Sequence, residues 1–321
     1  MLFEKEVLAR YRKRLYVRND NPHGIFYFSP EDFPGLNAHP YSFPSQKGYD
    51  LKGWFYHYEN PIPGRIVVLD HGMGNGHRAY MQEIARLARA GYLVFSYDHT
   101  GCMASGGESI NGFVQSLCDL DDCLNTLKKI PELAGYRYSV IGHSWGSFST
   151  MNIPAFHPDV AHVIGISGFI SVKQIVRQRF RGLLTAYRGL IIRQERAVNP
   201  RYADYSAVDT LKNTRAKVLL IHSMDDPVVR AEYHFIPLRK KLDGLPHIRF
   251  LELTGKRHNP HYTEDAVTCK DAFFDALREK LKDGTLSTPE QKREFMASQD
   301  WARMCAQDET VWEVILNTLE Q

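Results

Sequence analysis

A run of β-forming residues leads directly into Gly-His-Ser-Trp-Gly at residues 142–146, and a helix-compatible segment follows. A Gly-x-Ser-x-Gly sequence between a strand and a helix is typical of a sharp turn that holds its serine in a strained backbone conformation. Both glycines are needed because the strand and the helix pass so close that a Cβ would clash. The turn exposes the Ser144 hydroxyl and leaves the Trp145 amide at a helix N-terminus. We therefore expect a nucleophilic serine at Ser144.

Composition narrows the class of protein. The chain has 321 residues, of which 43% are hydrophobic and 24% charged, as in an ordinary globular protein. A formal net charge of +3 indicates neither nucleic-acid nor membrane binding by the molecule as a whole. No apolar run approaches the ~18 residues that a membrane span needs. Because Glu4 and Glu6 stand where a secretory signal would be apolar, we expect a cytoplasmic protein without integral membrane association.

The five cysteines form no CxxC pair and are odd in number. This pattern favours neither a zinc site nor a disulfide framework. Cys118 and Cys123 lie on one predicted helix, where they are most simply small apolar residues. No histidines show metal-ligand spacing, so the sequence predicts neither a metal nor a cofactor.

Short apolar runs alternate with helical patterns over most of the chain. A predicted hairpin joins residues 41–45 to 51–58, and buried strands follow at 65–70, 92–97, 138–143, 162–167, 216–221 and 248–253. Helical patterns cover 81–88, 112–130 and 264–281. This alternation predicts an α/β fold with a mostly parallel, doubly wound sheet and an N-terminal antiparallel hairpin.

Residues 170–215 interrupt this alternation. Apolar residues from Val176 to Ile191 recur at three- and four-residue spacing, which predicts one amphipathic helix. Residues 171–215 carry ten basic side chains against three acidic ones. We therefore expect a core domain formed by 1–169 and 216–321, with an N-terminal arm (1–40), a C-terminal helical extension (284–321) and a basic helical lid (170–215).

Two loops at strand ends carry the partners that a nucleophilic serine needs, a base and an acid to orient it. His222-Ser223-Met224-Asp225-Asp226-Pro227 follows the strand that ends near Ile221, and offers two carboxylates. Gly255-Lys256-Arg257-His258-Asn259-Pro260-His261 follows the last strand, and offers two histidines. The order Ser…Asp…His is the one this sheet architecture requires.

From about residue 41 to 283 the chain resembles an α/β-hydrolase of the esterase, lipase and serine-aminopeptidase-like group. The resemblance rests on His71-Gly72, the Gly-x-Ser-x-Gly turn, the Asp-x-x-Val of residues 226–229 and the Gly-x-x-His of residues 255–258. It implies catalytic roles for Ser144, Asp226 and His258, and an oxyanion hole formed by the backbone N–H groups of Met73 and Trp145. The chain departs from the family pattern at Ser223, where glycine is usual.

Alternatives remain for individual positions. Asp225 competes with Asp226 as the acid, and His261 competes with His258 as the base, although a rim or solvent position suits His261 better. His143, next to Ser144, and His222, at its strand end, are interpreted as packing residues. His71 is interpreted as a residue that stabilises its loop.

The resulting hypothesis is a serine hydrolase that cleaves carboxylic esters of a small-molecule acyl substrate through an acyl-enzyme intermediate. A serine peptidase or amidase is the runner-up, and it would need a carboxylate near the lid to hold the substrate amine, with Glu195, Asp204 and Asp209 as candidates. A thioesterase or acyltransferase, and a non-catalytic receptor on the same scaffold, are further alternatives. The sequence leaves open whether 284–307 covers the lid or forms a homodimer contact.

Overall fold

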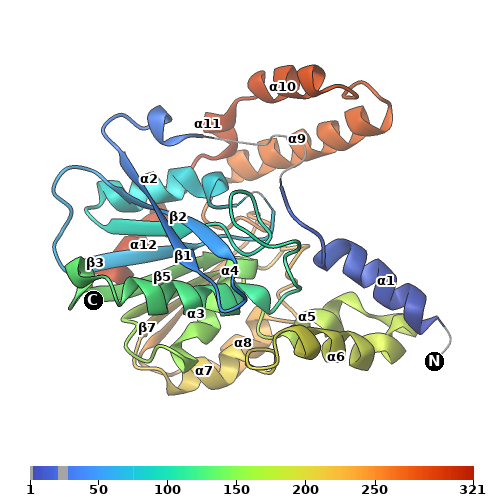
Figure 1. The fold of residues 1–321 in the computed structure, drawn as a ribbon, viewed down its shortest axis with the longest axis horizontal. Coiled ribbons are helices and arrows are strands. Elements are labelled where there is room, and N and C mark those ends of the chain that lie inside the picture. Colours follow the sequence, from blue (N-terminus) through green and yellow to red (C-terminus); the bar gives the residue numbers. More distant parts are fainter. Residues whose placement is uncertain (1–2, 21–27, 75) are drawn as a thin grey trace.

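One eight-stranded sheet organises the chain in the computed structural model, which describes residues 3–20, 28–74 and 76–321 (Figure 1). The strands lie in the order β1-β2-β4-β3-β5-β6-β7-β8. The first two pairings, β1 with β2 and β2 with β4, are antiparallel and the others are parallel. The strands are β1 (Asn37–Pro44), β2 (Asp50–His57), β3 (Arg65–Asp70), β4 (Leu93–Tyr97), β5 (Arg137–His143), β6 (His162–Ile166), β7 (Lys217–Ser223) and β8 (Ile248–Leu253). The predicted fold class is confirmed.

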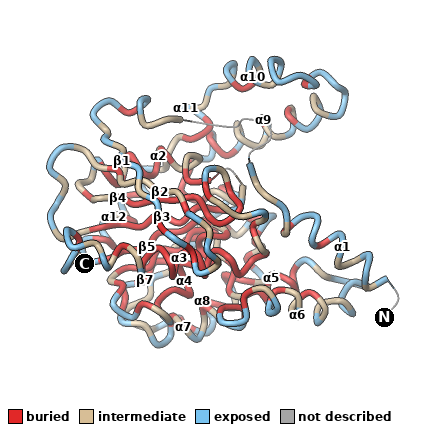
Figure 2. Tube along the Cα trace, viewed as in Figure 1, coloured by how far each residue is buried: buried red, intermediate tan, exposed pale blue. Residues whose placement is uncertain are grey.

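Helices cover both faces of the sheet, and the central strands are buried between them (Figure 2). The helices are α1 (Glu4–Leu15), α2 (Met81–Arg89), α3 (Gln115–Leu127), α4 (Trp145–Asn152), α5 (Val172–Arg179), α6 (Arg188–Val198), α7 (Ala207–Asn213), α8 (Phe235–Leu242), α9 (Glu264–Lys282), α10 (Pro289–Ala297), α11 (Trp301–Met304) and α12 (Glu309–Leu319). Side chains alternate along β3: Ile66 and Val68 join a core with α3, α4, α7 and α8, whereas Val67 and Leu69 join a core with α2 and α12. No described helix combines the length and apolar character that crossing a membrane requires.

The segment between β6 and β7 differs from its prediction. The single amphipathic helix expected from Val176 to Ile191 is wrong, because α5 ends at Arg179 and α6 begins at Arg188. A 3-10 turn separates them, and Gly182 at its start has a φ of +57°, outside the right-handed helical region. Leu183, which the pattern placed on a buried face, is 96% exposed. The division of the chain into a core and a lid stays a prediction.

The C-terminal extension packs on α9. Phe273 and Leu277 of α9 form a separate small core with Leu286, Met296 and Met304 from the residues that follow. Helices α10 and α11 therefore lie beside α9, on the opposite side of the molecule from α5 and α6 (Figure 1). The sequence left two roles open for residues 284–307. The first, covering the 170–215 segment, is wrong, because the two regions lie on opposite sides of the molecule (Figure 1). The second, a homodimer contact, stays a prediction.

The described part of the N-terminal arm begins with α1, as expected, and its last residues belong to β1. Pro22, which suggested an irregular path, lies outside the described residues, whereas Pro30 opens a short 3-10 turn. Helix α8 was not predicted from the sequence.

A buried carboxylate fastens α1 and α6 to the loop before α3. Glu195 of α6 is 1% exposed, and its oxygens accept hydrogen bonds from the hydroxyls of Tyr11 (2.6 Å) and Tyr16 (2.9 Å). They also accept from the backbone N–H groups of Phe113 (2.8 Å) and Val114 (3.3 Å). Burial raises the pKa of Glu195, which the four donors oppose.

We predict that Glu195→Ala lowers the free energy of unfolding by about 3 to 5 kcal/mol, because it leaves buried donors without an acceptor. Urea denaturation measures the change. Glu279→Ala, at an exposed glutamate of α9, is the matched control and should stay within ~0.5 kcal/mol of the parent protein. Equal losses in the two variants would contradict this account of Glu195.

Candidate active site

The turn between β5 and α4 is as tight as the sequence indicates. Ser144 has φ 56° and ψ −109°, a strained conformation for a residue with a side chain. A Cβ on Gly142 would lie 2.3 Å from the carbonyl oxygen of Gly146, and a Cβ on Gly146 would lie 2.0 Å from that of Asp70. Both glycines are therefore required by backbone contacts that cannot give way.

Three side chains from separate loops meet at this turn. The Ser144 Oγ lies 2.9 Å from Nε2 of His258, and Nδ1 of the same ring lies 2.8 Å from Oδ2 of Asp226. The other oxygen of Asp226 accepts hydrogen bonds from the backbone N–H groups of Val228 (2.8 Å) and Val229 (3.0 Å). The buried carboxylate is thereby fixed, and it orients the imidazole toward the hydroxyl.

The two adjacent aspartates have different surroundings. Asp226 is 3% exposed and contacts His258, whereas Asp225 is exposed and accepts a hydrogen bond from the Ser223 hydroxyl. The same hydroxyl accepts from the backbone N–H of Lys256 (3.2 Å). Ser223, the departure from the family pattern, thus ties the loop of the acid to the loop of the histidine.

The loop after β3 passes close to the turn that carries Ser144: a Cβ on Gly72 would lie 3.3 Å from the His143 carbonyl oxygen. The Gly72 N–H donates to the hydroxyl of Tyr80 (3.0 Å). Within the described part of the chain, neither the Met73 N–H nor the Trp145 N–H donates a hydrogen bond. These two amides are the ones that the resemblance to the α/β-hydrolases implies for an oxyanion hole. A cleft of about 220 Å³ lies at this place, lined by Met73, His143, His258 and, from α9, Lys270 and Phe274 among others.

His143 links the two loops that flank the serine, which the sequence did not indicate. Its Nδ1 lies 2.8 Å from the Tyr80 hydroxyl, and its Nε2 lies 2.8 Å from the backbone carbonyl of His258. Burial, and then the neighbouring His258 and His261, lower the pKa of His143 well below its usual value. A neutral ring therefore accepts from Tyr80 and donates to the His258 carbonyl. The contact chain runs from Gly72 through Tyr80 and His143 to His258.

Other histidines have structural partners. His71 contacts its own loop at the Gly72 carbonyl (2.7 Å) and accepts from the His99 N–H (3.0 Å), as interpreted from the sequence. His222 contacts the Val229 carbonyl (2.8 Å). The expectation of a rim or solvent position for His261 is wrong, because the residue is 1% exposed and its Nε2 lies 3.0 Å from Glu83 of α2.

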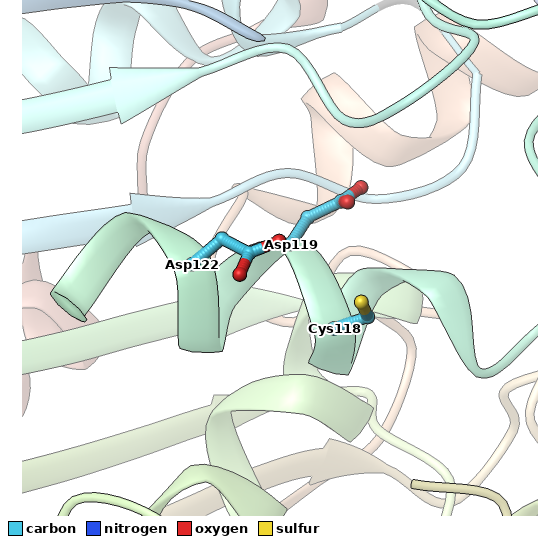
Figure 3. A group of neighbouring side chains, drawn as sticks. All are labelled: Cys118, Asp119 and Asp122. Atoms are coloured by element: carbon cyan, nitrogen blue, oxygen red, sulfur yellow. The ribbon is translucent and has the colours of Figure 1, made fainter. Parts of the chain in front are cut away.

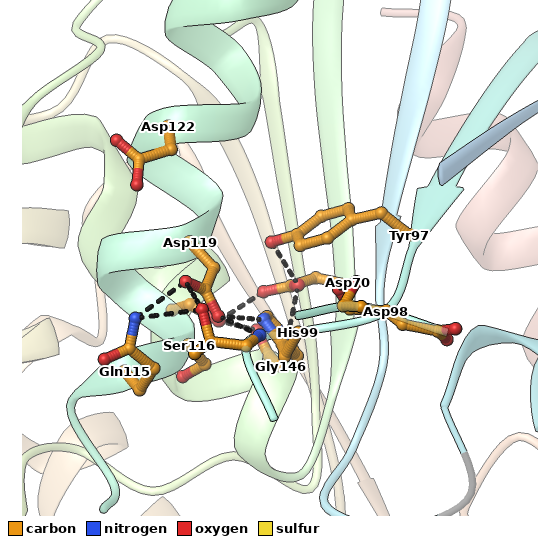
Figure 4. A network of polar contacts seen from close by, with 12 residues as sticks. Asp70, Tyr97, Asp98, His99, Gln115, Ser116, Asp119, Asp122 and Gly146 are labelled. Atoms are coloured by element: carbon orange, nitrogen blue, oxygen red, sulfur yellow. Dashed lines mark hydrogen bonds and ion pairs between the residues drawn. The ribbon is translucent and has the colours of Figure 1, made fainter. Parts of the chain in front are cut away.

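A buried group of charges lies beneath the turn (Figure 4). Nε2 of His99 lies 2.9 Å from Asp70, although not in line for a hydrogen bond, and Nδ1 lies 3.3 Å from Asp119. Burial opposes the positive charge, but Asp70 and Asp119 outweigh it and raise the pKa of His99 to about 9. The His99 ring also packs on Trp145, with centroids 4.7 Å apart, and Asp70 accepts a hydrogen bond from Ser149 of α4. The network thus holds α4 against the end of β3.

Cys118, Asp119 and Asp122 gather on α3 with potential metal-ligand atoms within 4.8 Å of one another (Figure 3). Asp119 already accepts from Thr100 and Gln115, and Asp122 accepts from the Gln46 N–H (2.8 Å). Burial raises the pKa of the Cys118 thiol far above its usual value, which disfavours the thiolate that metals bind. We assign these residues to packing and hydrogen bonding.

Known proteins share this arrangement of strands. Residues 61–206 match the family described as "Serine aminopeptidase, S33". An esterase from Pyrococcus furiosus is similar over 82% of this chain and 98% of its own, with 18% identity and a TM-score of 0.59. Two further structures are similar. A putative dienelactone hydrolase from Klebsiella pneumoniae matches over 89% of this chain and 99% of its own, with 16% identity and a TM-score of 0.54. An acylaminoacyl peptidase from Pyrococcus horikoshii matches over 71% of this chain and 38% of its own, with 16% identity and a TM-score of 0.56.

The fold is that of the α/β-hydrolases. This fold does not distinguish an ester from an amide substrate, because both esterases and peptidases share it.

The raised pKa of His99 leads to a pH-dependent stability. The pKa of His99 rises from about 6.5 in the unfolded chain to about 9 in the folded protein. Its charged ring therefore stabilises the folded state fully below pH 6.5, and this stabilisation is lost as the pH rises through 9. We predict that about 3 kcal/mol of unfolding free energy is lost over this interval. In His99→Gln that part of the pH dependence should be absent.

Urea denaturation at pH 6, 7.5 and 9 measures the free energy of unfolding of the parent protein and of His99→Gln. The difference between the two at each pH gives the contribution of the His99 charge. Should His99→Gln not fold, Asp119→Asn keeps one carboxylate partner of His99 and should move the loss to lower pH. Identical pH profiles for parent and variant would show that His99 carries no buried charge.

Proposed function

We propose that the protein is a serine hydrolase that cleaves carboxylic esters through an acyl-enzyme intermediate, with Ser144, His258 and Asp226 as its catalytic residues. The observation that carries the proposal is the hydrogen-bonded line from Ser144 through His258 to Asp226, with distances of 2.9 and 2.8 Å, on a strained turn. A nucleophile, a base and an orienting acid in this geometry are suited to acyl transfer.

The mechanism follows from the proton positions. His258 Nε2 accepts the Ser144 proton as Oγ attacks the acyl carbonyl, and Asp226 stabilises the imidazolium through Nδ1–H. The N–H groups of Met73 and Trp145 bind the tetrahedral oxyanion, and each such donor contributes roughly 3 to 4 kcal/mol to the transition state. The imidazolium then protonates the departing alkoxide. A water molecule, deprotonated by His258, attacks the acyl-enzyme and releases the acid.

The carboxylates near the 170–215 segment favour an ester over a peptide with a free N-terminus. Glu195 is buried and accepts four hydrogen bonds, and Asp204 is paired with Arg196 and Lys173. Asp209 lines a cavity at α7 together with Pro154 and Arg215, residues that do not line the cleft at His258. Among the described residues that line that cleft none is acidic, and one is Lys270. A cationic amine would therefore meet no counter-charge there.

The comparisons are consistent with this choice without deciding it. The similar structures include esterases and acylaminoacyl peptidases, and the matching family is described as a serine aminopeptidase. Amide cleavage is therefore the second candidate function. A thioesterase or acyltransferase would use the same three side chains. A cytoplasmic location and a small-molecule acyl substrate remain part of the proposal.

We predict that a fluorophosphonate probe labels the parent protein and fails to label Ser144→Ala. With p-nitrophenyl esters, Asp226→Asn should lower kcat by about 10³ to 10⁴, because the imidazole loses its orienting acceptor. Asp243→Asn, at an exposed aspartate that follows α8, is the matched control and should change kcat less than about threefold. Labelling of Ser144→Ala at the parent rate would refute the proposed nucleophile, and faster cleavage of aminoacyl anilides than of esters would favour the amidase.

A second prediction concerns the bridge through His143. Tyr80→Phe removes the hydroxyl that accepts from Gly72 and donates to His143, and so loosens both loops around Ser144. Loss of one such hydrogen bond costs about 1.4 kcal/mol, so we expect kcat to fall about tenfold with a smaller change in KM. Tyr58→Phe, at a surface tyrosine that contacts Arg89, should leave both parameters unchanged. Parent-like kcat in Tyr80→Phe would contradict a positioning role.

A further inference from the structure

A second cavity lies between α1, the end of α5 and the loop that carries Asp226. Its volume is about 910 Å³. Its wall consists of residues from three distant parts of the sequence: Val7, Arg10, Tyr11, Lys13, Arg14 and Leu15; Gln178, Arg179, Phe180, Arg181 and Leu184; Pro227 and Arg230. In Figure 1, α1 and α5 lie at the same end of the molecule.

Every charged side chain in this wall is cationic. Five arginines and one lysine line the cavity, and no aspartate or glutamate does. A cavity of the same volume beside α7 provides a contrast, because Asp159, Asp204 and Asp209 line it together with Arg215. The positive lining is therefore a property of this cavity and does not merely reflect the basic character of the 170–215 segment.

Most arginines of the cavity lack a carboxylate partner, although Arg230 pairs with Glu232 (2.6 Å). Arg188 donates to backbone carbonyls, and Arg196 pairs with Asp204. Within the described ranges, no carboxylate pairs with Arg14, Arg179 or Arg181. The Arg179 guanidinium lies over the Phe113 ring at 5.6 Å, and its surroundings lower its pKa, first by desolvation and also through the charge of Arg14. Unpaired like charges around one space are stabilised by a bound anion.

The cavity adjoins the residues proposed to be catalytic. Pro227 of its wall follows Asp226 directly in the chain. On the other side, the Phe113 ring beneath Arg179 belongs to the residue whose carbonyl accepts the indole N–H of Trp145 (2.7 Å). The wall thus includes part of the acid loop, and it is linked to the turn that carries Ser144 through the contacts of Phe113 with Arg179 and Trp145.

Apolar side chains share the wall with the cations. Val7, Leu15, Phe180 and Leu184 line the same space, and Leu184 is 45% exposed. A ligand that suits this lining combines an apolar chain with a terminal group bearing several anionic oxygens. Arginine binds carboxylate and phosphate through paired N–H donors, so both groups meet this description.

We propose that this cavity binds the anionic end of the substrate, so that the protein prefers esters carrying a carboxylate or phosphate group on an apolar chain. The proposal rests on the proposed ester hydrolysis for its kinetic test. Binding of the anion itself is independent of catalysis and can be measured in a protein without the Ser144 hydroxyl.

The kinetic test compares p-nitrophenyl hydrogen suberate, which ends in a carboxylate, with its neutral methyl ester. We expect kcat/KM to favour the anionic ester by about tenfold or more, and added salt to reduce this ratio. In Arg179→Gln and in Arg14→Gln the ratio should fall by about tenfold, because each removes one charged donor. Arg177→Gln, at an exposed arginine of α5 outside the cavity, is the matched control and should keep the parent ratio.

The binding test titrates Ser144→Ala with suberate and, separately, with inorganic pyrophosphate by calorimetry. Tighter binding of suberate indicates a carboxylate-bearing substrate, and tighter binding of pyrophosphate a phosphate-bearing one. Binding that weakens about tenfold on Arg179→Gln supports the site even if no ester is hydrolysed, in which case the proposed function fails alone. Hydrolysis of both esters at equal kcat/KM, with neither anion bound, would overturn the anion site and leave the proposed function standing.

Discussion

The contact between the turn at Ser144 and the end of β3 determines the geometry of the whole site. Gly146 lies against the Asp70 carbonyl, at a distance that leaves no room for a Cβ. The close approach requires a positive φ at Ser144, which costs on the order of 1 to 3 kcal/mol. The surrounding bonds offset this strain: the Ser144 N–H donates to the Ile166 carbonyl of β6, and Ser149 of α4 donates to the Asp70 carboxylate.

Buried polar groups stabilise each side of this turn, and their protonation follows from their partners. His99 lies between two carboxylates and is charged, whereas His143 contacts a hydroxyl and a carbonyl and is neutral. Glu195, in turn, is surrounded by four donors. An unpaired buried charge would cost several kcal/mol and an unpaired neutral polar group about 1 to 3 kcal/mol, so each of these groups constrains the loops that supply its partners. The loops that carry Met73 and His258 thereby acquire fixed positions relative to Ser144.

Local patterns in the sequence were sufficient for the sheet and for the positions of the candidate residues. The strands 65–70 and 248–253 are found with their predicted limits, and Asp226 and His258 follow strand ends that parallel pairing brings to one edge. Predictions failed for two different reasons. The burial of His261 depends on packing against Glu83, 178 positions away, which a local pattern does not reveal. The helix expected from Val176 to Ile191 is broken at Gly182, whose backbone conformation overrides the apolar spacing.

Charge around the site relates the choice of reaction to the choice of substrate. The cations of the cavity beside α1 place positive potential beside the loop that carries Asp226. A peptide with a free N-terminus would bring an ammonium group into this potential, and no described carboxylate lines that cavity or the cleft beside His258. An ester ending in an anion would be attracted by the same charges. The arrangement that supports an anion site is therefore also the physical reason for placing ester hydrolysis ahead of aminopeptidase activity.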